Sequence, residues 1–213
     1  MAVVQLRGLS RPLPPAEMVE SLDGRFEPAP YVTAWLRETL IDEGGVLTNE
    51  EHEHLRQAEI GVLWTTVINR RRERRIIGQA ELGDPQQGSK WSRARAVQQI
   101  EDWFGDVPDF IITLDARYCA VCDDASFAAL CEHELCHCSQ ERGEFGEPKF
   151  KRDGTPRFAL RGHDVEQFVS VVARYGMEAA GVAALVEAAR RGPTIAQARI
   201  EHACGTCVGR RAA

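Results

Sequence analysis

The segment Cys131–Cys138, with the sequence CEHELCHC, contains two histidines four residues apart. On a helix, residues with this spacing lie one turn apart on the same face. The imidazoles of His133 and His137 can then both bind one Zn²⁺, at about 2.0–2.1 Å each. Glu134 is rotated by about 100° from His133, which places its carboxylate beside such an ion and not on it. The pattern is that of an HExxH motif, in which the glutamate transfers protons.

The residues around this motif predict a helix over about residues 124–140. A stripe of apolar residues lies roughly opposite or lateral to the histidines and consists of Phe127, Cys131, Leu135 and Cys138. This stripe is expected to pack against a sheet and to leave the histidines facing a cleft. Its two cysteines are then small core residues. Cys136 lies nearer the histidines, either as a packing residue or as a neighbour of the metal ligands. The alternative is a chance match on a charged helix with ordinary surface histidines.

The rest of the chain predicts a mixture of helices and strands. β-Branched and aromatic residues predict strands at residues 60–67, 74–80 and 109–115. Helical spacing of apolar residues occurs at residues 31–41, 91–104, 163–176 and 177–191. This order predicts an α+β fold, with a small, mainly antiparallel sheet packed against the HExxH helix and a following helix that carries a third ligand. The expected organisation is an N-terminal arm (1–28), one domain (29–191) and a C-terminal tail with a Cys-x-x-Cys pair (192–213).

The composition is that of a globular protein with a hydrophobic core. The chain has 213 residues, of which 44% are hydrophobic and 27% charged, and its formal net charge is −6. The charged fraction excludes a membrane protein, and the apolar fraction excludes wholesale disorder. The N-terminus lacks the apolar core of a signal peptide. We therefore expect a cytoplasmic protein in which cysteines bind metal or are buried and do not form disulfides.

A catalytic zinc site has three protein ligands and one open position. The extended pattern HExxHxxGxxH is absent, so the third ligand must come from a more distant segment. His163 is one candidate, at the start of the helix predicted from the sequence RGHDVEQF. Glu166, three residues later, shares a helical face with His163 and competes for the role. Asp164 is favoured as a helix cap or as a hydrogen-bond partner of a ligand.

These two segments resemble a known family. HELCH on a helix after a strand, followed by GHDVEQF, resembles the SprT-like zinc metallopeptidases. HELCHC together with GHDVEQFVSVVARYG is still more similar to metallopeptidases that phages and prophages encode in a bacterial host. The resemblance covers about residues 109–176. It implies a zincin-like domain in which His133, His137 and His163 bind zinc and Glu134 is the general base.

The chain departs from the SprT-like pattern in its spacer, because 25 residues separate His137 from His163. This spacer contains Asp153-Gly154, which predicts a hairpin turn. A hairpin at residues 141–162 can offer an edge to an extended peptide. The alternative is a solvated loop with no binding role.

Two Cys-x-x-Cys pairs lie outside the motif helix, Cys119 with Cys122 and Cys204 with Cys207. If the pairs meet in space, their four thiolates can bind a second, structural zinc ion. The alternatives are buried thiols for the first pair and an exposed, redox-sensitive pair for the second.

The basic run Arg70–Arg75 raises the possibility of a nucleic-acid contact, which the DNA association of some SprT-like proteins would fit. The acidic chain and the lack of interleaved aromatic residues favour a solvated connection between strands instead.

The prediction from the sequence is a zinc-dependent peptidase that acts on peptide or protein substrates, with no membrane partner. The rival is a non-catalytic zinc-binding protein with a structural or partner-binding role. Glu134 distinguishes the two, because a purely structural metal site needs no base.

Overall fold

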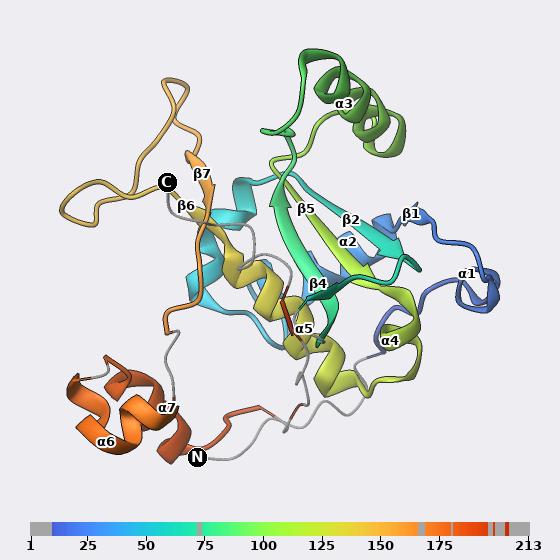
Figure 1. Cartoon of the computed structure of the whole chain (residues 1–213). Helices are drawn as coiled ribbons and strands as arrows, with labels where there is room; N and C mark the ends of the chain where they lie inside the picture. Colours follow the sequence, from blue (N-terminus) through green and yellow to red (C-terminus); the bar gives the residue numbers. More distant parts are fainter. Residues whose placement is uncertain are drawn as a thin grey trace.

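The computed structural model describes residues 10–71, 74–165, 169–179, 181–195, 198 and 203–204. Its larger sheet has the strand order β1-β2-β5-β4-β3, and β8 pairs with β4 outside this path (Figure 1). The strands are β1 (Phe26–Pro28), β2 (Ile60–Thr65), β3 (Arg70–Arg71), β4 (Arg74–Leu82), β5 (Phe110–Asp115) and β8 (Ala203–Cys204). β2 and β8 run parallel to their partners β5 and β4, and the other pairings are antiparallel. The predicted α+β class is confirmed, with a mixed sheet.

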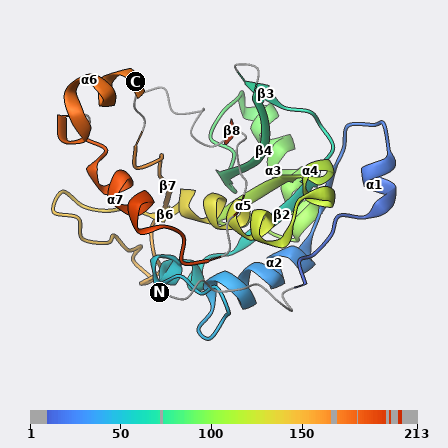
Figure 2. The ribbon, with the colours of Figure 1, turned by 90° about the horizontal axis from the view of Figure 1, so that it is seen from below.

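Helices cover both faces of this sheet. They are α1 (Ala16–Glu20), α2 (Pro30–Leu36) with its π-helical continuation η1 (Arg37–Ile41), the 3-10 helix η2 (Glu50–Gln57), α3 (Lys90–Phe104), α4 (Ala116–Val121), α5 (Asp124–His137), α6 (Val169–Ala179) and α7 (Ala183–Arg191). Figures 1 and 2 show α2 and α5 on one face of the sheet and α3 on the other. A second sheet pairs β6 (Cys138–Gln140) with β7 (Phe158–Leu160).

The side chains of β5 alternate between two hydrophobic layers, as strand geometry requires. Phe110, Ile112 and Leu114 are fully buried in the main core, together with residues of α2 and α5. Ile111 points to the other face of the sheet, where it packs with Leu63 of β2 and Ile100 of α3. Both faces of the sheet are therefore covered, and α5 is fixed on the larger of the two layers.

An aromatic cluster anchors the first half of α5. The ring of Phe127 lies 5.3 Å from that of Trp35 and 6.3 Å from that of Trp64, measured between centroids. The side chains of Phe127 and Trp64 are completely buried. This contact joins α5 to α2 and to the centre of the sheet.

The N-terminal segment, which the sequence predicts as an arm, packs along the domain in its described part. β1 pairs with β2, and Met18 of α1 is completely buried. The guanidinium of Arg11 donates hydrogen bonds to the carbonyl groups of Cys119 and Cys122, both at 2.5 Å. Residues 10–28 therefore contribute to the sheet and to the core.

Two predicted helix boundaries are wrong. α5 ends at His137 because the next three residues form β6 and pair with β7, so the backbone is extended where a helix over 124–140 was expected. The spacer forms the predicted hairpin, which continues through bridges from Arg142 to Pro148 and from Phe150 to Pro156. Residues 161–165 are not helical, and the described part of the next helix begins at Val169.

Helices α6 and α7 pack against each other after this segment. The helix predicted to end at residue 176 is interrupted there, because Gly176 inside α6 has a non-helical backbone (φ 84°, ψ 169°) that only glycine readily adopts. Beyond this kink α6 extends as far as Ala179. Within the described ranges, no single helix has the length and apolar character needed to cross a membrane. The bent pair of α6 and α7, at 94°, meets the length and composition criteria only when taken together.

The aromatic anchor of α5 gives a first test. Phe127→Ala should lower the free energy of unfolding by about 3–5 kcal/mol, because it removes a buried ring and leaves a cavity. Val121→Ala is the control, since this side chain is 82% exposed and its loss should change stability by about 0.5 kcal/mol or less. Urea denaturation of both variants measures the difference. Equal urea midpoints for Phe127→Ala and Val121→Ala would contradict the packing of α5 against α2 and the sheet.

Candidate metal centre

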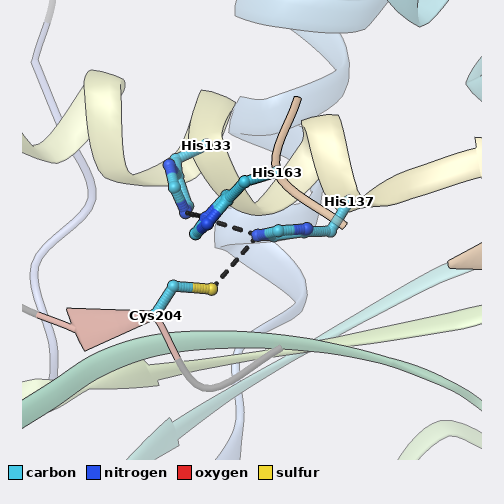
Figure 3. A group of neighbouring side chains, drawn as sticks. All are labelled: His133, His137, His163 and Cys204. Carbon is cyan, nitrogen blue, oxygen red and sulfur yellow. Dashed lines mark hydrogen bonds between the residues drawn. The ribbon is translucent and has the colours of Figure 1, made fainter. Parts of the chain in front are cut away.

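Four potential metal ligands converge at the end of α5: His133, His137, His163 and Cys204 (Figure 3). Their donor atoms all lie within 4.8 Å of one another. The Nε2 atom of His133 is 3.3 Å from that of His137 and 3.2 Å from that of His163. Two nitrogen ligands of a tetrahedral zinc ion are about 3.3–3.4 Å apart. The three imidazoles therefore have the spacing of a metal site.

Helix α5 supplies two of these ligands and the carboxylate between them. The helix begins with Asp123 as its N-cap, whose carboxylate accepts a hydrogen bond from the backbone N–H of Ser126 at 2.7 Å. One turn separates His133 from His137, and their ring centroids are 5.0 Å apart. His137 and Glu134 are buried, whereas His133 is partly exposed. The helical relation predicted from the HExxH spacing is present.

The backbone fixes the orientation of His137. Its Nδ1 atom lies 2.8 Å from the carbonyl oxygen of Arg161. Because a carbonyl only accepts hydrogen bonds, Nδ1 carries the proton and Nε2 presents its lone pair toward the other histidines. A hydrogen bond of this kind is the usual means by which a protein orients a histidine that binds metal.

Arg161 also positions His163. Its backbone N–H donates to the carbonyl of His137 at 3.0 Å, and its Nε donates to the carbonyl of Cys136 at 2.7 Å. These carbonyl groups belong to the last turn of α5, where a helix has no partners of its own for them. The chain is thereby held against the helix end, and His163 follows two residues later. This anchoring explains why His163 lies in a non-helical segment and not in the predicted helix.

Glu134 is completely buried against strand β4. A Cβ atom at Gly78 would lie 2.6 Å from Glu134 Oε1 and 2.9 Å from Leu130 Cδ1. A residue with a side chain would therefore displace the carboxylate. The signal in the sequence for this contact is Gly78 itself, because a glycine inside a predicted strand often marks a close approach.

Cys131 and Cys138 are core residues, as the sequence predicts, whereas Cys136 is partly exposed. Cys131 and Cys138 are completely or almost completely buried. Burial raises the pKa of both thiols well above the usual range, and it also raises the pKa of Cys136. Such thiols stay protonated at neutral pH, in keeping with a packing role.

Cys119 and Cys122 of the first Cys-x-x-Cys pair lie on or beside α4, whereas Cys204 of the second pair lies at the histidines. Cys119 is buried on α4, and the thiol of Cys122 donates to the Cys119 carbonyl at 3.7 Å. Cys204 lies instead in the histidine cluster, and among the described residues this cluster does not include Cys119 or Cys122. Cys207 lies outside the described residues, so the shared cysteine site remains a prediction.

The alternative third ligand and part of the basic run lie outside the described residues. Glu166, the alternative third ligand, is one of the residues that the structure does not describe. In the basic run 70–75, residues 72 and 73 are likewise not described, and Arg70 and Arg71 form β3. Arg75 pairs with Asp115 at 2.7 Å, so one charge of this run is used within the fold.

The class of protein follows from these observations. In a mixed α+β domain, helix α5 carries two histidines and a buried carboxylate, and the segment after the β6–β7 hairpin carries a third histidine. Three histidines with a neighbouring carboxylate are typical of metal-dependent hydrolases. The family model PhageMetallopep, described as "Putative phage metallopeptidase", matches residues 33–190. The chain therefore belongs to this family of phage metallopeptidases, as the resemblance predicted. No curated protein and no solved structure matches the chain.

The family match includes three of the four potential metal ligands. His133, His137 and His163 lie inside it, whereas Cys204 lies beyond its end at residue 190. The Cys-x-x-Cys spacing of Cys204 and Cys207 predicts a separate cysteine site, and no local pattern in the sequence links Cys204 to the histidines.

The contact between Gly78 and Glu134 can be tested directly. Gly78→Ala should displace the carboxylate and reduce hydrolysis of a protein substrate such as casein by about tenfold or more. Gly61→Ala is the matched control, because its Cβ would lie 2.7 Å from the ring of Phe104, away from Glu134. Both changes should lower the free energy of unfolding by about 1–3 kcal/mol. An equal loss of activity in the two variants would contradict a specific role for Gly78.

Proposed function

We propose that this protein is a zinc-dependent peptidase with a zincin-like arrangement of its site. In this proposal His133, His137 and His163 bind the ion, and Glu134 is the general base for hydrolysis of a peptide bond by water. The observation that supports it most is the spacing of the three Nε2 atoms, 3.2 and 3.3 Å from His133 to the other two.

The donor set fits zinc. Three imidazoles are the protein ligands of one class of catalytic zinc site, and the hydrogen bond from His137 to the Arg161 carbonyl selects the tautomer that can ligate. When bound, a zinc ion acts as a Lewis acid on the substrate carbonyl and lowers the pKa of water.

Glu134 performs the proton transfers in this proposal. Its carboxylate follows His133 in the sequence and is shielded from solvent by β4. It takes a proton from the attacking water and delivers that proton to the amine that leaves when the peptide bond breaks. The tight fit against Gly78 holds the carboxylate in one place, so little conformational entropy is lost when it is oriented for proton transfer.

A second candidate is a non-catalytic zinc site with a structural role. The observation in its favour is Cys204, whose Sγ lies 3.1 Å from His137 Nε2 and gives the cluster a fourth donor. Four protein ligands close a zinc site, as is usual for structural zinc. This candidate gives no reason for burying the Glu134 carboxylate beside the ligands.

Glu134→Gln distinguishes the two candidates. The amide has nearly the same shape but takes up no proton, so we expect zinc content to stay unchanged and casein hydrolysis to fall by about 100-fold or more. Glu132→Gln is the control on the same helix, since Glu132 only accepts a hydrogen bond from Asn49 at 2.9 Å. Equal rates for wild type and Glu134→Gln, with the wild-type rate clearly above background, would exclude the catalytic assignment.

The third ligand is tested by metal content. His163→Ala, made in a Cys204→Ser background so that no fourth donor replaces it, should lose tightly bound zinc, measured by elemental analysis after dialysis, because two imidazoles from α5 alone bind zinc weakly. Glu166→Ala should keep one equivalent. If only the Glu166 variant loses zinc, the third ligand is Glu166 and the assignment of His163 is wrong.

A further inference from the structure

Strand β8 brings Cys204 to the histidines from the C-terminal part of the chain. Its Sγ lies 3.1 Å from His137 Nε2 and 3.9 Å from Glu134 Oε2. The strand runs parallel to β4, with Cys204 opposite Gly78, the glycine that contacts Glu134. Figure 3 shows the sulfur directed at the imidazoles from the side of the sheet.

We propose that Cys204 is the fourth metal ligand and that β8 occupies the place of the substrate, so that the described conformation is a latent form of the peptidase. The inference rests on the proposed function of the same site. Withdrawal of β8 would open both the fourth coordination position and the edge of β4.

The position of the sulfur supports ligation. In a tetrahedral zinc site with Zn–S of about 2.3 Å and Zn–N of about 2.0–2.1 Å, the sulfur and each nitrogen are about 3.5–3.6 Å apart. The observed distance from Sγ to His137 Nε2, 3.1 Å, is about 0.4–0.5 Å shorter than this, and the sulfur lies within 4.8 Å of the donor atoms of the other two histidines. The sulfur also contacts Glu134, and the attacking water needs contact with both the ion and this carboxylate. Thiolate and water therefore compete for one position.

The pairing of β8 supports substrate mimicry. An extended peptide is commonly bound by addition to a free sheet edge. β8 makes this contact with β4 at Ile76 and Gly78, beside Glu134. In the described residues the pairing extends over Ala203 and Cys204 only and includes a register shift. So short a ladder is readily displaced.

Binding of Cys204 to the metal and its release require neither an oxidant nor a reductant. When Cys204 binds, its thiol proton goes to solvent and a water molecule leaves the ion. When β8 withdraws, the sulfur takes up a proton and water returns, with no change in the oxidation state of sulfur or metal. The latent form is thus reversible.

The ligation is tested by replacing the metal with Co²⁺ in the full-length protein. A thiolate-to-cobalt charge-transfer band should appear in the near-ultraviolet spectrum of the wild type and of Cys122→Ser. The band should be missing in Cys204→Ser, although the d–d bands of the three-histidine site remain. A wild type without the band, or a band that depends on Cys122 and not on Cys204, would overturn the proposal.

Latency is tested by activity at equal metal content. Cys204→Ser should cleave casein at least about tenfold faster than the wild type, and Cys122→Ser at the wild-type rate. A Cys204→Ser variant that loses its metal, or that is no faster than the wild type, would overturn the latent form. If the charge-transfer band is present but the double variant Cys204→Ser/Glu134→Gln is as active as Cys204→Ser, the proposed catalytic role of Glu134 fails and the ligation by Cys204 stands.

Discussion

Helix α5 ends at His137, and its last carbonyl groups accept hydrogen bonds from Arg161. The Arg161 carbonyl in turn accepts a hydrogen bond from His137 Nδ1. One residue therefore satisfies the end of the helix, orients its second histidine and brings His163 within 3.2 Å of His133. The candidate metal centre depends on this interaction, because without it the long hairpin after α5 would leave His163 with no fixed place.

The sheet contributes the other constraint. Strand β4 lies close to α5 only because Gly78 has no side chain, and the space it leaves is filled by Glu134. The same strand pairs with β8, so the carboxylate, the histidines and Cys204 are all placed relative to β4. A metal ion that binds such a cluster also stabilises the fold, since the unfolded chain does not hold its ligands together.

Much of this arrangement follows from local sequence patterns. The period of apolar residues predicts α5, and the spacing of His133 and His137 places them on one face. The strands that contain Trp64 and Ile112 are predicted from their β-branched and aromatic residues. What local patterns do not contain are contacts between distant segments. Three features depend on such contacts. The end of α5 at His137 results from the pairing of β6 with β7, and the non-helical segment at His163 results from the hydrogen bonds of Arg161. The approach of Cys204 results from the pairing of β8 with β4.

In our proposal, two histidines of α5 and one from the segment after it hold one zinc ion. This is tested by anomalous diffraction at the zinc absorption edge, on crystals of the protein purified with zinc. We expect one strong peak at about 2.0–2.1 Å from the Nε2 atoms of His133, His137 and His163. A peak that lacks any of these three nitrogens, or the absence of a peak at the end of α5, would contradict it.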